Sequence, residues 1–251
     1  MEAKLKLPDE ISCDVWQGGL RRKFKLNGCA AQIVEPPEPL EGNPWFWLPE
    51  WPTAFPERNG VKDLLKMGYH MVHIDVFGKC GSPEAVGIMR SMYDFVRTLG
   101  FAEKAALIGM SLGGLYSFRY AAKYPETVAC IYADAPVATL SYRVESRRAD
   151  AVEFSRAYGL GDDTAKLFDH PLAPVNNYLP MVKAGIPLLL IVGLADTSVD
   201  AEKNGLLLAE RWLAAGGRAE VIKRPYWGHH PHGLDDTTKI VRFILSSTLN
   251  K

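Results

Sequence analysis

Apolar and polar positions follow two different periods along the chain, and their succession predicts the fold. Four short apolar runs have the length and continuity of strands buried on both faces: residues 69–76, 105–108, 128–133 and 187–193. Stretches with helical spacing of apolar side chains lie among them: residues 60–67, 83–99, 115–124 and 200–215. Strands that alternate with helices predict an α/β fold, with a mostly parallel sheet covered by helices on both faces.

The two ends of the chain extend this pattern. Residues 13–34 contain strand-like runs separated by turn signals at Gly18-Gly19 and Asn27-Gly28, which predict a β-hairpin followed by a strand at residues 30–34. The aromatic run at residues 45–48 is interpreted as a central strand, and residues 219–223 as the last one. A final helix is expected from about residue 235 to about residue 249.

One segment does not fit the alternation. Residues 137–180 are polar, irregular and only partly helical. They follow a predicted buried strand and precede another, so we expect them to form a small cap inserted into a single domain that spans residues 1–251.

Residues 105–124 contain the motif that bears on chemistry. A short apolar run leads into Gly109-Met110-Ser111-Leu112-Gly113, and a helical pattern follows. A strand, a G-x-S-x-G turn and a helix, in this order, are the context in which a nucleophilic serine is expected. The turn is sharp and brings neighbouring backbones close together, which glycine at positions 109 and 113 allows. A glycine-rich turn with an incidental serine is the simpler interpretation.

Composition and charge narrow the choice of partner. Lys plus Arg and Asp plus Glu both number 29, so the formal net charge is zero and no nucleic-acid or membrane partner is indicated. The four cysteines lack metal-site or disulfide-framework spacing. We therefore expect no cofactor and no metal, a small-molecule substrate and, because the amino-terminal residues lack a signal-peptide core, a cytoplasmic location.

Acid–base residues follow two later strands. Asp196 comes just after the strand at residues 187–193, and His229 follows the strand at residues 219–223. In open parallel sheets the site lies at the carboxyl ends of the strands, so both are expected beside Ser111. Serine needs a base to remove its proton, imidazole serves near pH 7, and a carboxylate fixes the imidazole's tautomer.

The order Ser…Asp…His and the pieces GMSLGG, IVGLAD and PYWGHHPH resemble the α/β-hydrolase superfamily along the whole chain. The segments PWFWLPEW, CGSPEAV, CIYADAP and GHHPHGL look like a bacterial, serine esterase-like subgroup. This resemblance implies the fold named above, with Ser111 as nucleophile, His229 as general base and then acid, and Asp196 as the orienting acid. It also implies acyl or methyl esters of sugars as possible substrates.

Rivals exist for two of these roles. His230 and His232 crowd the same loop, and His229 is favoured because the family commonly places glycine directly before its histidine, as Gly228 stands here. Asp134 follows the strand after the serine motif, where some relatives place the acid. A metal site at the histidines is disfavoured because no cluster of Asp, Glu or Cys accompanies them in the sequence.

An oxyanion in the reaction needs two backbone donors. The resemblance assigns one to Leu112, the residue after the nucleophile. The second is expected after the strand at residues 45–48, and because Pro49 has no N–H, Leu48 is preferred with Glu50 behind it.

Aromatic residues beside the predicted site suggest how a substrate is held. Trp51, Trp227 and Phe77 lie on loops next to the expected triad and are our candidates for substrate contact. The sequence predicts a serine carboxylic-ester hydrolase that forms an acyl-enzyme. The alternatives are the same triad acting on a peptide, a lactone or a C–C bond, and a non-catalytic binding protein with this fold.

Overall fold

A computed structural model describes residues 5–249, and its central element is one nine-stranded sheet. The strands run in the order β1-β2-β3-β5-β4-β6-β7-β8-β9. The neighbours from β1 to β5 pair antiparallel, and those from β5 through β4 to β9 pair parallel. The predicted α/β fold with a mostly parallel sheet is confirmed.

Residues 10–35 form the antiparallel edge of the sheet. It contains β1 (Glu10–Trp16), β2 (Gly19–Leu26) and β3 (Cys29–Glu35), joined by the two predicted turns. β1 is exposed along almost its whole length, as expected for an edge strand. The parallel region comprises β4 (Trp45–Trp47), β5 (His70–Ile74), β6 (Ala105–Met110), β7 (Val128–Asp134), β8 (Leu188–Gly193) and β9 (Ala219–Arg224).

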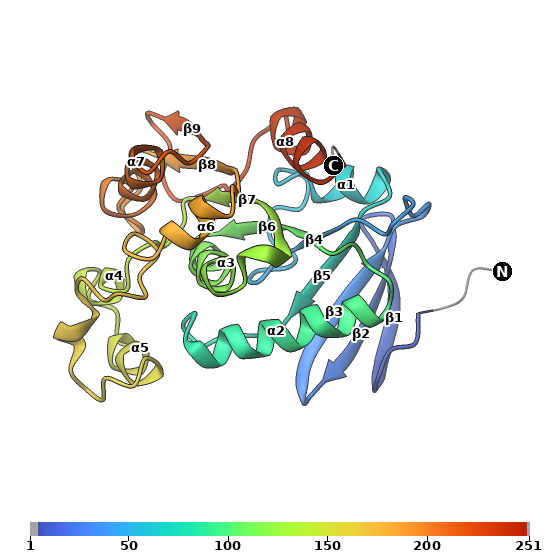
Figure 1. Cartoon of the computed structure of the whole chain (residues 1–251), viewed down its shortest axis with the longest axis horizontal. Helices are drawn as coiled ribbons and strands as arrows, with labels where there is room; N and C mark the ends of the chain where they lie inside the picture. The colour runs from blue at the N-terminus through green and yellow to red at the C-terminus, as the bar shows by residue number, and fades with distance from the viewer. Residues whose placement is uncertain (1–4, 250–251) are drawn as a thin grey trace.

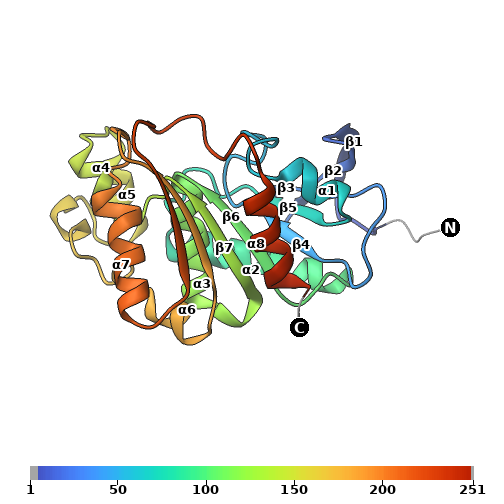
Figure 2. The same cartoon turned by 90° about the horizontal axis from the view of Figure 1, so that it is seen from above.

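Helices cover both faces of the sheet (Figures 1 and 2). α1 (Val61–Lys66) and α8 (Thr238–Thr248) pack on one face. α2 (Pro83–Thr98), α3 (Leu112–Lys123) and α7 (Leu207–Ala214) pack on the other. Strand residues alternate between the two cores: Trp45 and Trp47 both point to the α2 and α3 side, and Phe46 points to the α1 side. Both tryptophans are fully buried, so they belong to the core.

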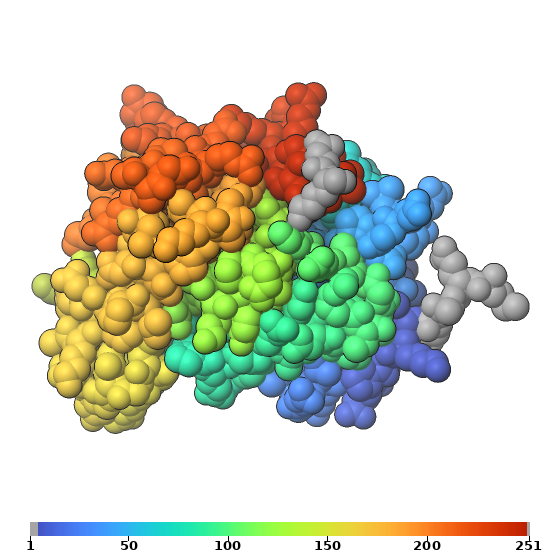
Figure 3. Space-filling view, in the orientation of Figure 1, coloured from blue at the N-terminus to red at the C-terminus, as the bar shows by residue number. Residues whose placement is uncertain are grey.

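The segment between β7 and β8 contains only short helices. They are α4 (Tyr142–Glu145), α5 (Ala151–Ala157), the 3₁₀ turn Thr164–Leu167 and α6 (Leu179–Lys183). α4 and α5 lie at the end of the molecule opposite β1, where the yellow atoms gather in the space-filling view (Figures 1 and 3). This segment contributes one wall to the site described below.

The helix expected at residues 200–215 is divided. A π-helical turn, Glu202–Leu206, precedes α7. Its Asn204 is buried, and its side-chain oxygen accepts hydrogen bonds from the backbone N–H groups of Ala138 and Thr139, at 2.9 and 3.0 Å. The π turn thus ties the start of the 137–180 segment to the helix after β8. Among residues 5–249, no helix has the length and apolarity required to cross a membrane.

Candidate active site

Ser111 occupies the sharp turn between β6 and α3. Its φ is 49° and its ψ −120°, a strained backbone conformation for a residue with a side chain. The turn is anchored to the end of β7, because Ser111 N–H donates to the Asp134 carbonyl and its own carbonyl accepts from Val137, both at 2.9 Å. The predicted strand–serine–helix turn is present.

Close backbone packing explains the glycines of this turn. A Cβ atom built on Gly109 would lie 2.8 Å from the Gly113 carbonyl oxygen, and one on Gly114 would lie 2.3 Å from the side chain of Pro136. Gly113 is less crowded, with Glu50 Cβ at 3.2 Å. Gly109 and Gly114 are therefore the positions where a side chain cannot fit, rather than Gly109 and Gly113 as the motif suggested.

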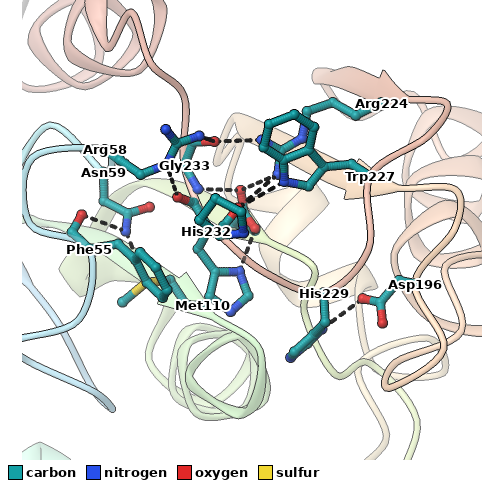
Figure 4. A network of polar contacts seen from close by, with 12 residues as sticks. Phe55, Arg58, Asn59, Met110, Asp196, Arg224, Trp227, His229, His232 and Gly233 are labelled. Carbon is teal, nitrogen blue, oxygen red and sulfur yellow. Dashed lines mark hydrogen bonds and ion pairs between the residues drawn. The ribbon is translucent and has the colours of Figure 1, made fainter.

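Asp196 lies in the loop after β8. One of its carboxylate oxygens accepts the backbone N–H groups of Ser198 and Val199, at 2.8 and 2.9 Å. The other lies 2.7 Å from His229 Nδ1 (Figure 4). Burial by itself raises the pKa of Asp196, but the hydrogen bonds from His229 and Val199 outweigh it and the pKa is lowered. The carboxylate is thus ionised at neutral pH.

His229 connects this carboxylate to the serine. Its Nε2 lies 2.9 Å from Ser111 Oγ, and its side chain is 12% exposed. The backbone before Asp196 and the backbone before His229 approach each other closely: a Cβ atom on Gly193 would lie 2.3 Å from the Trp227 carbonyl oxygen. The fold brings Ser111, His229 and Asp196 into one chain of hydrogen bonds. In the sequence, Ser111 is 118 residues and Asp196 is 33 residues from His229.

The rival residues form a second pair. His232 Nδ1 lies 2.6 Å from one oxygen of Asp134, whose other oxygen accepts the Gly233 N–H at 2.9 Å. Both side chains are at most 3% exposed. Asp134 is therefore bound to His232 rather than to His229, and the structure favours Asp196 as the partner of His229.

His230 is exposed, and its ring contacts those of His229 and His232. Its ring stacks on Phe55 with centroids 5.8 Å apart. Burial of the ring, and then the nearby His232 and His229, lower its pKa. No hydrogen bond joins it to Ser111 within the described residues, so His229 is the histidine that reaches the serine hydroxyl.

The prediction for the second oxyanion donor is wrong. Leu48 N–H donates to the Val72 carbonyl at 3.0 Å, continuing the pairing of β4 with β5. Because this N–H already donates a hydrogen bond within the sheet, it cannot donate to a substrate oxygen. Leu112 is the first residue of α3, so its N–H has no acceptor inside the helix and remains the first candidate.

Glu50, the second choice for that role, is an unusual buried acid. It is 3% exposed, its side chain packs against Gly113, and Oε2 has no hydrogen-bond partner in the part of the chain that is described. Burial, and then the nearby Asp75 carboxylate, raise the pKa of Glu50 to about 8. The side chain is thus largely protonated at neutral pH beneath the loop that carries Trp51.

Two cavities meet at Ser111. The larger, about 430 Å³, extends toward α4 and α5, and the smaller, about 330 Å³, extends toward Phe55 and His232. Their walls share five residues: Trp51, Ser111, Arg148, Ser198 and His229. A still larger cavity, about 730 Å³, lies at the amino ends of β7, β8 and β9 and has none of these residues in its wall.

Two of the three predicted aromatic contacts line the larger cavity. Trp51 and Phe77 meet edge to face with ring centroids 5.7 Å apart, and they are 43% and 65% exposed. Trp227 does not contribute to either cavity at Ser111 within residues 5–249. Its ring lies under the guanidinium of Arg224, at 4.4 Å, and its Nε1 donates to the Pro231 carbonyl. The prediction that Trp227 contacts substrate is therefore replaced by a role in holding the histidine loop.

Sequence reasoning missed the opposite wall of the larger cavity. It comes from α4, α5 and the loop between them, and includes both aromatic and charged residues: Tyr142, Arg143, Arg148, Asp150, Glu153 and Phe154. The one available signal was the placement of residues 137–180 between two strands whose carboxyl ends lie at the site. Which of its side chains face Ser111 depends on tertiary packing.

Two other histidines lie away from Ser111. His73 is hydrogen-bonded, with Nδ1 2.7 Å from the Leu48 carbonyl oxygen. His70 is buried against Phe101, with ring centroids 4.5 Å apart, but its Nδ1 finds no partner among the described residues. Burial lowers the pKa of His70 to about 4. His70 is thus a neutral core residue at pH 7, away from the site.

Comparison with known proteins agrees with this architecture. The family model of the alpha/beta hydrolase fold matches residues 48–179, more than half of the chain. The chain belongs to this family. A comparison with curated proteins gives no match.

Solved structures show the same fold at low sequence identity. Est1E from Butyrivibrio proteoclasticus is 16% identical, with 93% of this chain and 100% of that chain covered and a TM-score of 0.65. An S-formylglutathione hydrolase from Agrobacterium tumefaciens is 16% identical, with 94% and 95% covered and a TM-score of 0.62. An acylaminoacyl peptidase from Pyrococcus horikoshii is 17% identical, with a TM-score of 0.61; 90% of this chain matches, but only 38% of that chain is covered.

Proposed function

We propose that this protein is a serine carboxylic-ester hydrolase that acts through an acyl-enzyme intermediate. The observation that carries the proposal is the continuous path Asp196–His229–Ser111, with distances of 2.7 and 2.9 Å, at the junction of two cavities. Esterase-like structural relatives support the same class of reaction. A binding protein would have no need of a strained serine aligned with an oriented imidazole.

The proposed reaction begins at Ser111. Its Oγ attacks the ester carbonyl carbon while His229 Nε2 accepts the hydroxyl proton, and the Asp196 carboxylate stabilises the imidazolium through Nδ1. The tetrahedral intermediate collapses when the C–O bond to the alcohol breaks and His229 returns the proton to the departing oxygen. Water then attacks the acyl-enzyme by the same route, which releases the acid and restores Ser111.

The negative oxygen of the intermediate needs donors aligned in advance. We propose the N–H of Leu112 as the first. We propose the backbone N–H of Trp51, in place of that of Leu48, as the second donor. The Leu48 N–H is already bonded within the sheet and Pro49 has no N–H, whereas Trp51 lines both cavities together with Ser111. The protonated Glu50 beneath this loop avoids a second negative charge near the oxyanion.

Ser111 lies in the wall of both cavities, so one cavity can hold the acyl group of an ester and the other its alcohol group. Trp51, Phe77, Tyr142 and Phe154 around the larger cavity offer aromatic faces to an acyl chain or to a sugar ring. In this proposal residues 137–180 act as the cap that closes that side. An acyl or methyl ester on a carbohydrate is the finer form of the proposal, and it rests on the sequence resemblance alone.

The test is a substrate panel on purified protein, with Ser111→Ala and a matched control. Ser91 is a second serine, on α2, whose hydroxyl bonds the Ile88 carbonyl away from the site. We expect hydrolysis of p-nitrophenyl acetate and butyrate by the wild type and Ser91→Ala, and none above background by Ser111→Ala. Release of acetate or methanol from acetylated or methyl-esterified sugars in preference to these esters would support the carbohydrate form. Hydrolysis of peptides or lactones without ester hydrolysis would overturn the ester assignment.

A further inference from the structure

The three histidines of the loop after β9 form a triangle of imidazoles. Ring centroids lie 4.7 Å apart for His229 and His230, 4.9 Å for His229 and His232, and 4.9 Å for His230 and His232. One ring nitrogen from each lies within 4.8 Å of the others. Ring planes tilted by 70° to 83° to one another allow the three nitrogens to converge on one point.

Two of these imidazoles are oriented by carboxylates. Asp196 binds Nδ1 of His229 and Asp134 binds Nδ1 of His232, at 2.7 and 2.6 Å. A carboxylate behind one ring nitrogen fixes the tautomer and leaves a lone pair on the other nitrogen, Nε2; in His229 this lone pair faces Ser111 Oγ. Such a carboxylate is usual behind metal-bound histidines. The sequence disfavoured a metal because acidic residues do not accompany the histidines locally. The fold supplies both carboxylates from strand ends that are 98 and 33 residues away in the chain from the histidines they contact.

The third histidine, His230, lies at the surface, where an ion from solvent can reach it. His230 is exposed, and all three rings form part of the wall of the smaller cavity, so an ion can enter from solvent. Zinc–nitrogen bonds of about 2.0–2.1 Å place the nitrogens of a tetrahedral site about 3.3 Å apart. Closing the triangle to that spacing requires the three nitrogens to move closer together. Carboxylates hold the rings of His229 and His232, so the exposed His230 ring has the most freedom to turn.

We propose that His229, His230 and His232 bind a divalent transition-metal ion, Zn²⁺ or Cu²⁺, and that the bound ion inhibits the enzyme reversibly. Imidazole nitrogens prefer these ions, whereas Mg²⁺ and Ca²⁺ prefer oxygen ligands. The ion takes the Nε2 lone pair of His229 that otherwise accepts the Ser111 proton. The inhibitory part of this inference rests on the proposed function; the binding part does not.

Binding is tested directly by titration calorimetry with ZnCl₂ on Ser111→Ala, which removes catalysis from the measurement. We expect one ion per chain and no heat of binding with MgCl₂. His230→Gln should weaken binding at least tenfold, and Asp134→Asn should weaken it about 10- to 100-fold by removing the carboxylate behind His232. His170→Gln, a histidine outside the triangle, serves as the matched control and should bind like its parent. Absence of binding, or binding that His230→Gln leaves unchanged, would overturn the site.

Inhibition is measured separately on p-nitrophenyl acetate hydrolysis, with each variant compared with its own metal-free rate. Micromolar Zn²⁺ should inhibit the wild type and His170→Gln, EDTA should restore the rate, and His230→Gln should need at least tenfold more Zn²⁺ for the same inhibition. Binding without inhibition, or a rate increased by Zn²⁺, would overturn the inhibitory role. Failure of the wild type to hydrolyse any ester would refute the proposed function, while calorimetry would still decide whether the ion binds.

Discussion

Two aspartate–histidine pairs lie side by side at the carboxyl edge of the sheet, and they differ in what the imidazole meets. Asp196 and His229 connect to Ser111 Oγ at 2.9 Å. His232 is more deeply buried than His229, and Asp134 has two further partners, Gly233 N–H and the guanidinium of Arg224, at 2.9 and 3.9 Å. The same chemical pair thus has a proposed catalytic role in one place and holds a loop in the other.

The surroundings of the second pair indicate its structural role. His232 O accepts from Arg58 Nε at 2.9 Å, and Gly233 O accepts from Arg224 Nη1 at 2.7 Å (Figure 4). These bonds fasten the loop after β9 to the loop before α1 and to β9 itself. The loop that carries His229 is therefore held at its far end by the Asp134 pair.

The largest effect on activity is expected from Ser111, which the Asp196–His229 pair contacts. Ser111→Ala should lower kcat/KM for p-nitrophenyl acetate roughly 10⁶-fold, to background, because no other hydroxyl lies on His229 Nε2 in the described structure. Steady-state kinetics with Ser91→Ala as control measures it. Retention of more than a tenth of the wild-type rate would remove Ser111 from the mechanism.

The next effect separates the two carboxylates. Asp196→Asn should lower kcat roughly 10⁴-fold, since an amide cannot hold His229 in the required tautomer. Asp134→Asn should lower kcat less than about tenfold, since His232 does not touch Ser111. The two variants, which carry the same chemical change, are compared at equal folded fraction; the reverse ranking would make Asp134 the orienting acid.

Stability should also depend on the Asp134 carboxylate. Asp134 accepts hydrogen bonds from His232 and Gly233 in a fully buried place, and loss of each charge-assisted bond costs about 1.5–3 kcal/mol. Asp134→Asn should therefore lower the free energy of unfolding by about 3 kcal/mol, measured by urea unfolding followed by fluorescence. A loss of less than about 1 kcal/mol would contradict the structural role.

A smaller effect concerns the acid beneath the Trp51 loop. Because folding raises the pKa of Glu50 from 4.5 to about 8, the folded chain holds a proton that the unfolded chain has lost. The contribution to stability is complete below pH 4.5 and falls as pH rises to about 8, by about 1.4 kcal/mol per pH unit. Glu50→Gln should flatten this decline between pH 5 and 8.

Thermal unfolding at several pH values measures the effect of Glu50→Gln. The exposed Glu41→Gln is the matched control and should leave the wild-type pH dependence unchanged. An unchanged slope in Glu50→Gln would show that the buried carboxyl is already ionised at neutral pH.

Much of this arrangement follows from patterns that are local in sequence. Apolar runs of strand length and helical spacing predict the sheet and its covering helices, and strand ends predict where Ser111, Asp196 and His229 meet. These inferences succeed because parallel strands place their carboxyl ends at one edge regardless of side-chain detail.

The errors come from contacts between segments distant in the chain. Leu48 was preferred as the second oxyanion donor because Pro49 has no N–H, but the Leu48 N–H donates to the Val72 carbonyl across β4 and β5. Trp227 lies two residues before His229 in sequence, yet its ring packs against Arg224 and lines neither cavity at Ser111 within the described residues. Neither the partner of a backbone N–H nor the direction of a loop side chain is encoded in spacing alone.

The most direct test of the central claim is covalent labelling with a fluorophosphonate, which forms a stable adduct with a serine that an adjacent imidazole activates. Intact-mass and peptide mass spectrometry should find one adduct, on Ser111, in the wild type and in Asp134→Asn. Labelling should be strongly slowed in Asp196→Asn and absent in Ser111→Ala. An unlabelled wild type, or an adduct on any other residue, would contradict the account.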